Sequence, residues 1–194
     1  MIIPREWREC LFEIQKDFPN AVIAGGCLRD CYFKREIKDV DIFIPEVDNA
    51  ALEKFLVNKY NVSITRNIQA KKYDNVKNPE VDQVITVANA AGKYPVDFIA
   101  VDVNKERVLA RFDYDICQLS YDLNNFIMTD EFKNCTKTKT IHLIRCDDAD
   151  QWKRSTGARL DKLRGKYPEF AVDLGLYQNI YDPFKHVLSR GIAF

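Results

Sequence analysis

The part of the chain that decides the fold is residues 21–45, AVIAGGCLRDCYFKREIKDVDIFIP. Residues 21–24 form a short apolar run that predicts a buried strand. Gly25 and Gly26 end this run, and the apolar side chains after them recur at helical spacing: Cys27, Leu28, Cys31 and Tyr32. The stretch therefore predicts a strand, a glycine turn, a helix and a second strand.

Two aspartates, Asp39 and Asp41, stand at the start of the second predicted strand. Side chains alternate along a strand, so two residues separated by one position leave the same face. Magnesium is usually held by one or two carboxylates together with substrate phosphates. The spacing therefore predicts that these carboxylates share a cation, and the alternative interpretation is a solvated strand end.

The glycine pair has its own chemistry. Glycines adopt backbone angles that other residues resist, and their bare backbone lets N–H groups approach phosphate oxygens at the start of a helix. A glycine pair alone is also typical of an ordinary turn. Followed by Asp39 and Asp41 at this separation, Gly25 and Gly26 predict a site for a triphosphate with metal beside it.

Two blocks resemble a known family. Residues 25–30, GGCLRD, followed by Asp39 and Asp41, resemble the signature of the nucleotidyltransferase head domain of tRNA nucleotidyltransferases and bacterial poly(A) polymerases, within the DNA polymerase beta superfamily. Residues 111–122, RFDYDICQLSYD, are similar to the family's Arg-Arg-Asp-Phe-Thr-Ile-Asn-Ala-Leu-Ala-Tyr-Asp stretch. The second block departs from that pattern at Phe112, Asp115 and Cys117, which stand for arginine, threonine and asparagine.

The resemblance covers roughly residues 20–145 and implies a fold and a reaction. The fold is mixed α/β, a small twisted sheet flanked by helices. The reaction is transfer of a nucleoside monophosphate from an NTP to an acceptor hydroxyl, first of all an RNA or tRNA 3′ end, with release of pyrophosphate. Asp39 and Asp41 would hold two Mg²⁺ or Mn²⁺ ions, which align the reacting groups.

The resemblance also implies roles for residues around the nucleotide. Gly25, Gly26 and Arg29 would hold the β- and γ-phosphates. Asp30 would position Arg29 or cap the local turn. Arg111 and Asp113 would contact the ribose or the triphosphate. The nucleotide-binding residues implied by the resemblance are therefore Gly25, Gly26, Arg29, Asp30, Arg111 and Asp113.

Asp97 lies in residues 95–101, PVDFIAV, where its neighbours are apolar. A buried carboxylate without a partner is costly, so we expect a cation near it. In the resembling family an acidic residue on the following strand completes or supports the metal site, and Asp97 matches that position. Asp102 is the alternative, but its odd separation from Asp97 directs it to the other face.

Positive charge is concentrated toward the C-terminus. A predicted helix carries Lys153, Arg154, Arg159, Lys162, Arg164 and Lys166. Such a run is often a solvated face. Because the related enzymes place a basic helix after the catalytic sheet, Arg159 and Lys162 become further candidates for nucleotide binding.

Other segments complete the predicted organisation. Residues 7–18 have helical spacing, and Asp48 or Asn49 can cap a second helix that ends near Tyr60. Residues 84–87 and 96–101 predict strands joined by a hairpin at 89–93. Residues 62–64 form an apolar run, and residues 66–82 predict a loop or a long hairpin end. We expect a catalytic domain over 1–147 and a helical extension packed on it over 148–194.

Composition limits the class of protein. The chain has 194 residues, 46% of them hydrophobic, so it can bury one core. It has no continuous apolar stretch of membrane-spanning length and no secretion signal, and we expect a cytoplasmic location. The formal net charge of zero argues against a wholly basic nucleic-acid coat.

Cysteine and histidine content favours no other chemistry. The six cysteines are expected to be reduced thiols, with Cys27 and Cys31 as packing residues and not half of a zinc site. The two histidines, His142 and His186, are expected to be structural. Two alternatives to an RNA-directed enzyme stay open: a stand-alone nucleotidyltransferase that modifies a protein or small molecule, and a catalytically silent nucleotide-binding module.

Overall fold

Helices and strands alternate along the chain around one large sheet. The structure is a computed structural model that describes residues 1–60, 67–69, 81–146 and 151–177. Its α-helices are α1 (Arg5–Gln15), α2 (Gly26–Tyr32), α3 (Asn49–Tyr60), α4 (Asp130–Thr138) and α6 (Gly157–Lys166). Its strands are β1 (Val22–Ala24), β2 (Val40–Pro45), β3 (Asn67–Gln69), β4 (Val81–Ala91), β5 (Tyr94–Val101), β6 (Leu119–Tyr121), β7 (Phe126–Met128), β8 (Thr140–His142) and β9 (Ala171–Asp173).

Short helices fill the connections. The 3₁₀ turns η2 (Lys105–Arg107), η3 (Leu109–Arg111) and η4 (Asp115–Cys117) lead from β5 to β6. A π-helix, η5 (Trp152–Thr156), leads directly into α6, and the 3₁₀ turn η6 (Gly175–Tyr177) follows β9.

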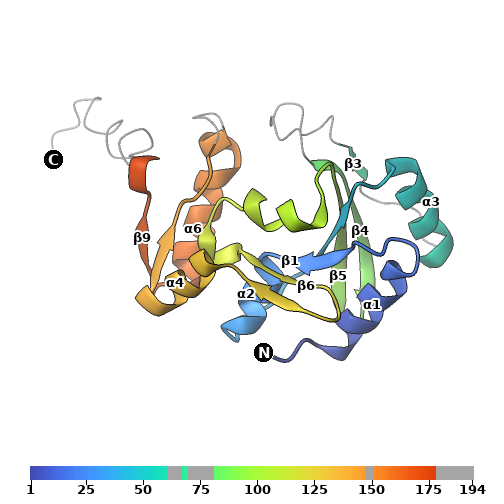
Figure 1. Cartoon of the computed structure of the whole chain (residues 1–194), viewed down its shortest axis with the longest axis horizontal. Coiled ribbons are helices and arrows are strands. Elements are labelled where there is room, and N and C mark those ends of the chain that lie inside the picture. The colour runs from blue at the N-terminus through green and yellow to red at the C-terminus, as the bar shows by residue number, and fades with distance from the viewer. Residues whose placement is uncertain (61–66, 70–80, 147–150, 178–194) are drawn as a thin grey trace.

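The main sheet has seven strands in the order β3-β4-β5-β2-β1-β6-β7 (Figure 1). Strands β2 and β5 run parallel, and the other neighbouring pairs of this sheet are antiparallel. The mixed sheet with flanking helices confirms the predicted α/β class. Strands β8 and β9 form a separate parallel pair.

The local predictions around the glycine turn are confirmed. Strand β1, the turn and α2 follow one another as the sequence indicates. Helix α3 takes Asp48 as its cap, because the Asp48 carboxylate accepts the N–H of Ala51 at 2.8 Å. The predicted hairpin joins β4 to β5, and Gly92 supplies a positive φ of 67° at its turn.

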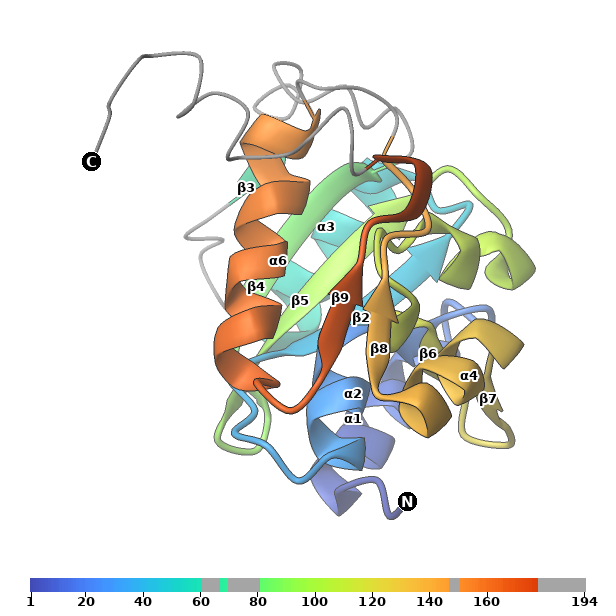
Figure 2. The ribbon, with the colours of Figure 1, turned by 90° about the vertical axis from the view of Figure 1, so that its left-hand side faces the viewer.

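The two faces of β2 have different environments. Val40, Ile42 and Ile44 are buried in the main core, which α1 and α3 cover. Asp41 and Phe43 point to the opposite face. Figure 2 shows α6 in front of β4 and β5, whereas α1 and α3 lie beyond these strands. The acidic residues therefore occupy the sheet face on the side of α6.

The C-terminal segment is not helical throughout. The predicted basic helix is present as η5 and α6, but β9 follows it and pairs with β8. A three-residue strand is too short to show periodicity, so no pattern in the sequence predicted β9. This segment is tied to the preceding part of the chain, since the Tyr114 hydroxyl donates to the carbonyl of Thr156 at 2.9 Å.

All six cysteines are free thiols; Cys27 is buried, and Cys31 is only partly buried. Within the described ranges, no helix has the length and apolar character needed to cross a membrane. The apolar run at 62–64, most of the polar segment at 66–82 and His186 lie outside the described residues.

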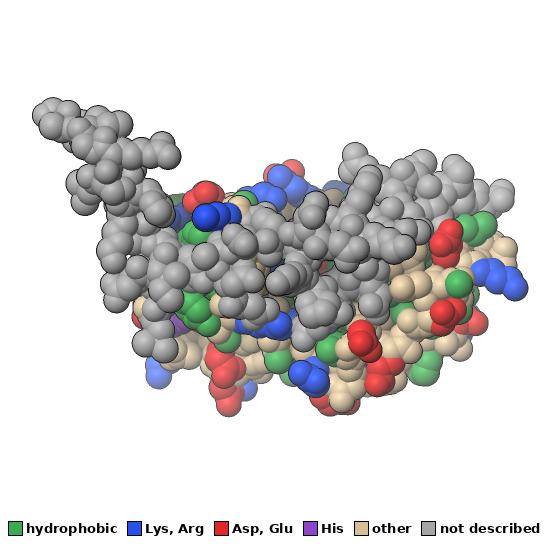
Figure 3. All heavy atoms as spheres, turned by 90° about the horizontal axis from the view of Figure 1, so that it is seen from above, with side chains coloured by type: hydrophobic (Ala, Val, Ile, Leu, Met, Phe, Trp, Pro, Cys, Tyr) green, Lys and Arg blue, Asp and Glu red, His purple; other side chains and the backbone are tan. Residues whose placement is uncertain are grey.

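On the face seen in Figure 3, acidic and basic side chains are interspersed over the described part of the chain.

The buried face of β2 generates a stability prediction. Ile42 is fully buried, whereas Ile127 on β7 of the same sheet is 44% exposed. We expect Ile42→Ala to lower the free energy of unfolding by about 3 kcal/mol, because it removes apolar contacts and leaves a cavity. Chemical denaturation measures this change. Ile127→Ala is the matched control, and equal losses in the two variants would contradict the assignment of the core face.

Candidate active site

Three aspartates gather where β2 and β5 run side by side. In the parallel register of these strands Asp41 lies opposite Asp97, and Asp39 immediately precedes β2. Asp39 is exposed, while Asp41 and Asp97 are partly buried. The parallel pairing thus brings together the carboxylates that the sequence singled out, from positions more than fifty residues apart.

The charges of these aspartates affect one another. Burial, followed by the negative charges of Asp39 and Asp97, raises the pKa of Asp41 to about 7. Burial and the charge of Asp97 also raise the pKa of Asp39. Like charges in a partly desolvated site favour either a shared proton or a bound cation. The acidic face therefore has the electrostatic character of a cation site.

The carboxylates do not form a complete three-ligand cage. Among the described residues, no group of three or more His, Cys, Asp or Glu side chains has the arrangement of a metal site. The Asp97 carboxylate accepts a hydrogen bond of 2.5 Å from the Thr86 hydroxyl, which orients it toward β4. Asp39 and Asp41 remain as a pair of oxygen donors, which fits an ion that completes its shell with water and substrate phosphates.

The glycine turn is tightly packed. Gly25 has a φ of 82°, and a Cβ placed on it would lie 2.7 Å from the Phe112 ring. The Gly25 N–H donates to the carbonyl of Leu119 at 3.0 Å, so it is already used between β1 and β6. Of the two glycines predicted to bind phosphate, Gly25 has a packing role here, and Gly26 begins α2.

Arg29 and Asp30 form the centre of a polar network. The Arg29 guanidinium donates to the Asp30 carboxylate at 2.8 Å and to the Cys117 sulfur at 3.0 Å. Lys166, the last residue of α6, also donates to Asp30, and so does the hydroxyl of Tyr167 just beyond the helix. Of the two roles considered for Asp30, the geometry matches the positioning of Arg29. The sequence placed Lys166 only among the charges of the basic helix and did not single out Tyr167, because no motif links either residue to the glycine turn.

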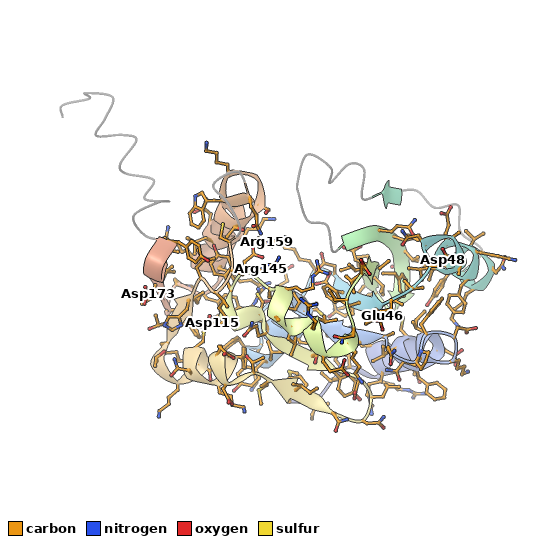
Figure 4. The ribbon with its side chains drawn as sticks, turned by 45° about the horizontal axis from the view of Figure 1, so that its top comes forward. Glu46, Asp48, Asp115, Arg145, Arg159 and Asp173 are labelled. Carbon is orange, nitrogen blue, oxygen red and sulfur yellow. The ribbon has the colours of Figure 1, made fainter. Side chains whose placement is uncertain are left out.

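Asp113 is bound by protein groups and not directed at open space. Its buried carboxylate accepts from Arg159 at 2.7 Å and from the Thr156 hydroxyl at 2.8 Å. The geometry makes Asp113 a partner of Arg159, and the nucleotide contact that the resemblance implied for Asp113 stays a prediction. Figure 4 shows Arg159 and Arg145 on one side of the molecule, away from Glu46 and Asp48.

Two remaining candidates have simpler surroundings. Arg111 is the last residue of η3 and is partly buried. Lys162 is exposed on α6, one helical turn beyond Arg159. Arg159, which is itself largely exposed, lies close enough for its charge to oppose the rise in the pKa of Asp41.

Asp115, which stands where the resembling motif has threonine, has a partner in the fold. The buried Asp115 carboxylate lies 2.6 Å from the Nδ1 atom of His142 and accepts the backbone N–H of the same residue at 3.0 Å. Burial raises the pKa of Asp115, although the contacts with His142 oppose that rise. His142 therefore joins β8 to η4, a contact that fits the structural role predicted for it.

The seven-stranded mixed sheet, the glycine turn and the acidic face place the chain in the nucleotidyltransferase fold class. The chain belongs to the Gabija anti-defense 2 family, whose sequence model matches residues 4–139. The comparison with curated protein sequences found no match.

Solved structures share this fold at low sequence identity. A tRNA-processing enzyme in an apo form has a TM-score of 0.62 and 17% identity, over 100% of this chain and 50% of that one. The Thermotoga maritima CCA-adding enzyme complexed with a tRNA has a TM-score of 0.62 and 15% identity, over 97% and 44%. A tRNA nucleotidyltransferase with a primer tRNA and an ATP analog has a TM-score of 0.59 and 18% identity, over 92% of this chain and 51% of that one. The chain spans about half the length of these structures.

The raised pKa of Asp41 generates a prediction for the metal-free protein. Between the ordinary value near 3.8 and about 7, the native state holds a proton that the unfolded chain releases. This carboxylate therefore lowers the free energy of unfolding as the pH rises through that range. We expect Asp41→Asn to be more stable than the native sequence at pH 7.5, and the difference to shrink toward pH 4.

Denaturation at several pH values measures this difference. Asp102→Asn, an exposed aspartate just after β5, is the control and should follow the native sequence at every pH. Added Mg²⁺ should reduce the advantage of Asp41→Asn, because a cation stabilises the charged carboxylate. A difference that does not depend on pH would contradict the crowding of the carboxylates.

The packing at Gly25 generates a second prediction. Gly25→Ala should lower the free energy of unfolding by about 2 kcal/mol or more, because its backbone conformation disfavours a side chain and Phe112 occupies the space. Gly26→Ala is the matched control, since its Cβ would meet only Arg29 at 3.5 Å. Thermal denaturation of both variants measures the loss of stability. Equal losses in Gly25→Ala and Gly26→Ala would contradict the prediction that the backbone of Gly25 and its contact with Phe112 exclude a side chain there.

Proposed function

We propose that this chain is a metal-dependent nucleotidyltransferase that moves a nucleoside monophosphate from an NTP to an acceptor hydroxyl, and that this activity opposes Gabija defense. The observation that carries the proposal is the pair Asp39 and Asp41 beside Asp97, on the sheet face next to the glycine turn. A silent nucleotide-binding module would not need Asp39 and Asp97 beside Asp41, where burial and their charges raise the pKa of Asp41 at the expense of stability.

Asp39 and Asp41 are proposed to hold Mg²⁺ or Mn²⁺ together with the phosphates of the NTP. When bound, such ions stabilise the charge on the attacking and leaving oxygens of a displacement at phosphorus. Asp97 supports the pair from β5, where Thr86 fixes the orientation of its carboxylate. The protein thus supplies the oxygen donors and a rigid sheet that keeps them in place.

The triphosphate is proposed to lie between the start of α2 and α6. Gly26 opens α2, and Arg29 is held beside this glycine by Asp30. Across from them Arg159 is held by the buried carboxylate of Asp113. Guanidinium groups that are already oriented lose less freedom on binding a phosphate. Lys162 adds an exposed charge on the same helix.

The acceptor hydroxyl belongs to an RNA 3′ end or, alternatively, to a protein or a small molecule. Solved structures with this fold include enzymes in complex with tRNA, CTP and ATP, which supports an NTP donor and an RNA acceptor. The family description supports an acceptor whose modification interferes with Gabija defense. These two lines of support are compatible, because a component of the defense or an RNA on which it depends can carry the hydroxyl.

Substitution of the paired aspartates tests the catalytic proposal. We expect Asp39→Asn and Asp41→Asn each to reduce metal-dependent pyrophosphate release at least ~100-fold, a loss of about 2.7 kcal/mol in transition-state stabilisation. Pyrophosphate is measured with each NTP and a mixed pool of RNA and protein acceptors. The variants should remain folded, because Asp39 and Asp41 are not part of the apolar core.

Asp102→Asn is the matched control for these variants, because it lies on an exposed position after β5. It should retain the native rate. Undiminished pyrophosphate release by Asp39→Asn or Asp41→Asn would remove the metal assignment. In a parallel assay of Gabija defense, the native chain should lower protection, and the two active-site variants should not; equal effects would separate the anti-defense role from catalysis.

A further inference from the structure

A basic hollow lies where the loop before β2 meets the turn between β4 and β5. Its volume is about 520 Å³, and it is lined by Arg35, Glu36, Ile37, Lys38, Lys93 and Tyr94. Residues 35–38 belong to the loop from α2 to β2, and Lys93 and Tyr94 belong to the turn that joins β4 to β5. Figure 2 shows this loop and this turn on the same side, at the end of α6 that carries Lys166.

The charges of the hollow are mostly positive and partly uncompensated. Arg35 is paired with Glu169 at 2.6 Å. Lys38 and Lys93 make no ion pair with an acidic side chain of the described residues, and the Lys93 ammonium lies 5.1 Å from the centre of the Tyr94 ring. Glu36 is the one acidic side chain of the lining. Two lysines are therefore available to an anionic ligand.

The loop that carries Lys38 is held in place. The Arg35 N–H donates to the carbonyl of Asp30 at 2.8 Å, and Lys166 of α6 donates to the carbonyl of Glu36. The other wall is the rigid β4–β5 hairpin, where Tyr94 packs edge-on against Trp7 with ring centres 5.8 Å apart. A ligand would meet a preformed surface and not one that must be ordered on binding.

The position of the hollow relates it to the reaction. Lys38 directly precedes Asp39, and Tyr94 lies three residues before Asp97 in the parallel pair of β2 and β5. With a rise of about 3.3 Å per residue, Tyr94 begins roughly 10 Å before Asp97 along β5, and the odd separation turns its ring to the other face, against Trp7. The groups assigned to the triphosphate, Arg29 and Arg159, lie instead between α2 and α6.

We infer that this hollow is the acceptor site of the enzyme and that it binds the sugar-phosphate backbone of a single-stranded nucleic acid, with Lys38 and Lys93 on phosphates. The inference rests on the proposed function, since the bound strand would present its terminal hydroxyl toward Asp39. It assigns the acceptor to a surface that is separate from the phosphate-binding groups of the NTP.

A nucleic acid fits the hollow better than an acidic peptide does. Grooves for single strands combine cations that follow the backbone with an aromatic ring on which a base can stack. Lys38 and Lys93 supply the cations, and the partly exposed Tyr94 supplies the ring. An acidic peptide would use the lysines but would not require the ring beside them.

Equilibrium binding tests the inference without any chemistry. The probe is a fluorescently labelled single-stranded RNA of about 12 nucleotides, a length within the usual range for such sites. We expect Lys38→Glu/Lys93→Glu to weaken binding about tenfold at low salt and to reduce the slope of log affinity against log salt by about 1.4, or 0.7 for each lost phosphate contact. Fluorescence anisotropy in a salt series measures both quantities.

The matched control is Lys54→Glu/Lys137→Glu, which reverses the same charge at exposed positions on α3 and α4, outside the hollow. This control should bind the RNA nearly as the native chain does. Equal losses in the two double variants would overturn the inference, because they would indicate a general charge effect. Unchanged binding by the Lys38 and Lys93 variant would overturn it directly.

Two further measurements separate this inference from the proposed function. Affinity for NTP with Mg²⁺ should be the same in the single variant Lys93→Glu and the native chain; a loss of NTP affinity parallel to the loss of RNA affinity would place this lysine in the donor site and overturn the inference. A polyglutamate peptide that displaces the RNA and itself depends on both lysines would favour a protein acceptor instead. If RNA binding depends on the lysines but no NTP yields pyrophosphate, the hollow stands as a binding site and the catalytic proposal fails.

Discussion

The parallel pairing of β2 with β5 is the constraint on which the rest of this molecule depends. It is the single parallel contact of the seven-stranded sheet, and its register sets Asp41 opposite Asp97. A shift of one residue would turn every side chain of one strand to the other face. The buried residues Ile42 and Phe98 prevent such a shift, because they would then leave the apolar core. Hydrophobic burial on one face therefore fixes the carboxylates on the other.

The sequence was most informative where structure and chemistry are both local. Strand β1, the glycine turn, α2 and β2 fall within twenty-five residues, and each has a clear signal in residue type or spacing. The Asp48 cap and the β4–β5 hairpin belong to the same category. The resemblance matched Asp97 to the acidic residue that supports the metal site, and alternation directed Asp102 to the other face, but neither could give the register between β2 and β5.

Contacts between distant segments could not be predicted in this way. The buried carboxylate of Asp113 pairs with Arg159, and Asp30 joins α2 to Tyr167; neither pair has a characteristic spacing along the chain. The strand β9 is formed by three ordinary residues whose pairing with β8 is decided by the tertiary fold. A motif also does not show how its residues are packed. The Phe112 ring lies against Gly25, and the Leu119 carbonyl accepts the Gly25 N–H, and neither contact could be predicted from the glycine pair.

Lys166 has a consequence that reaches beyond its own contacts. Its ammonium group donates both to the Asp30 carboxylate, which holds Arg29, and to the backbone carbonyl of Glu36, which lines the basic hollow. A ligand that changes the contact of Lys166 with Glu36 therefore also changes the support of Arg29. Coupling free energies between two sites are reciprocal, so the factor by which one ligand changes the affinity for the other is the same in both directions. One side chain at the end of α6 thus links the loop of the proposed acceptor site to the support of Arg29 in the proposed triphosphate site.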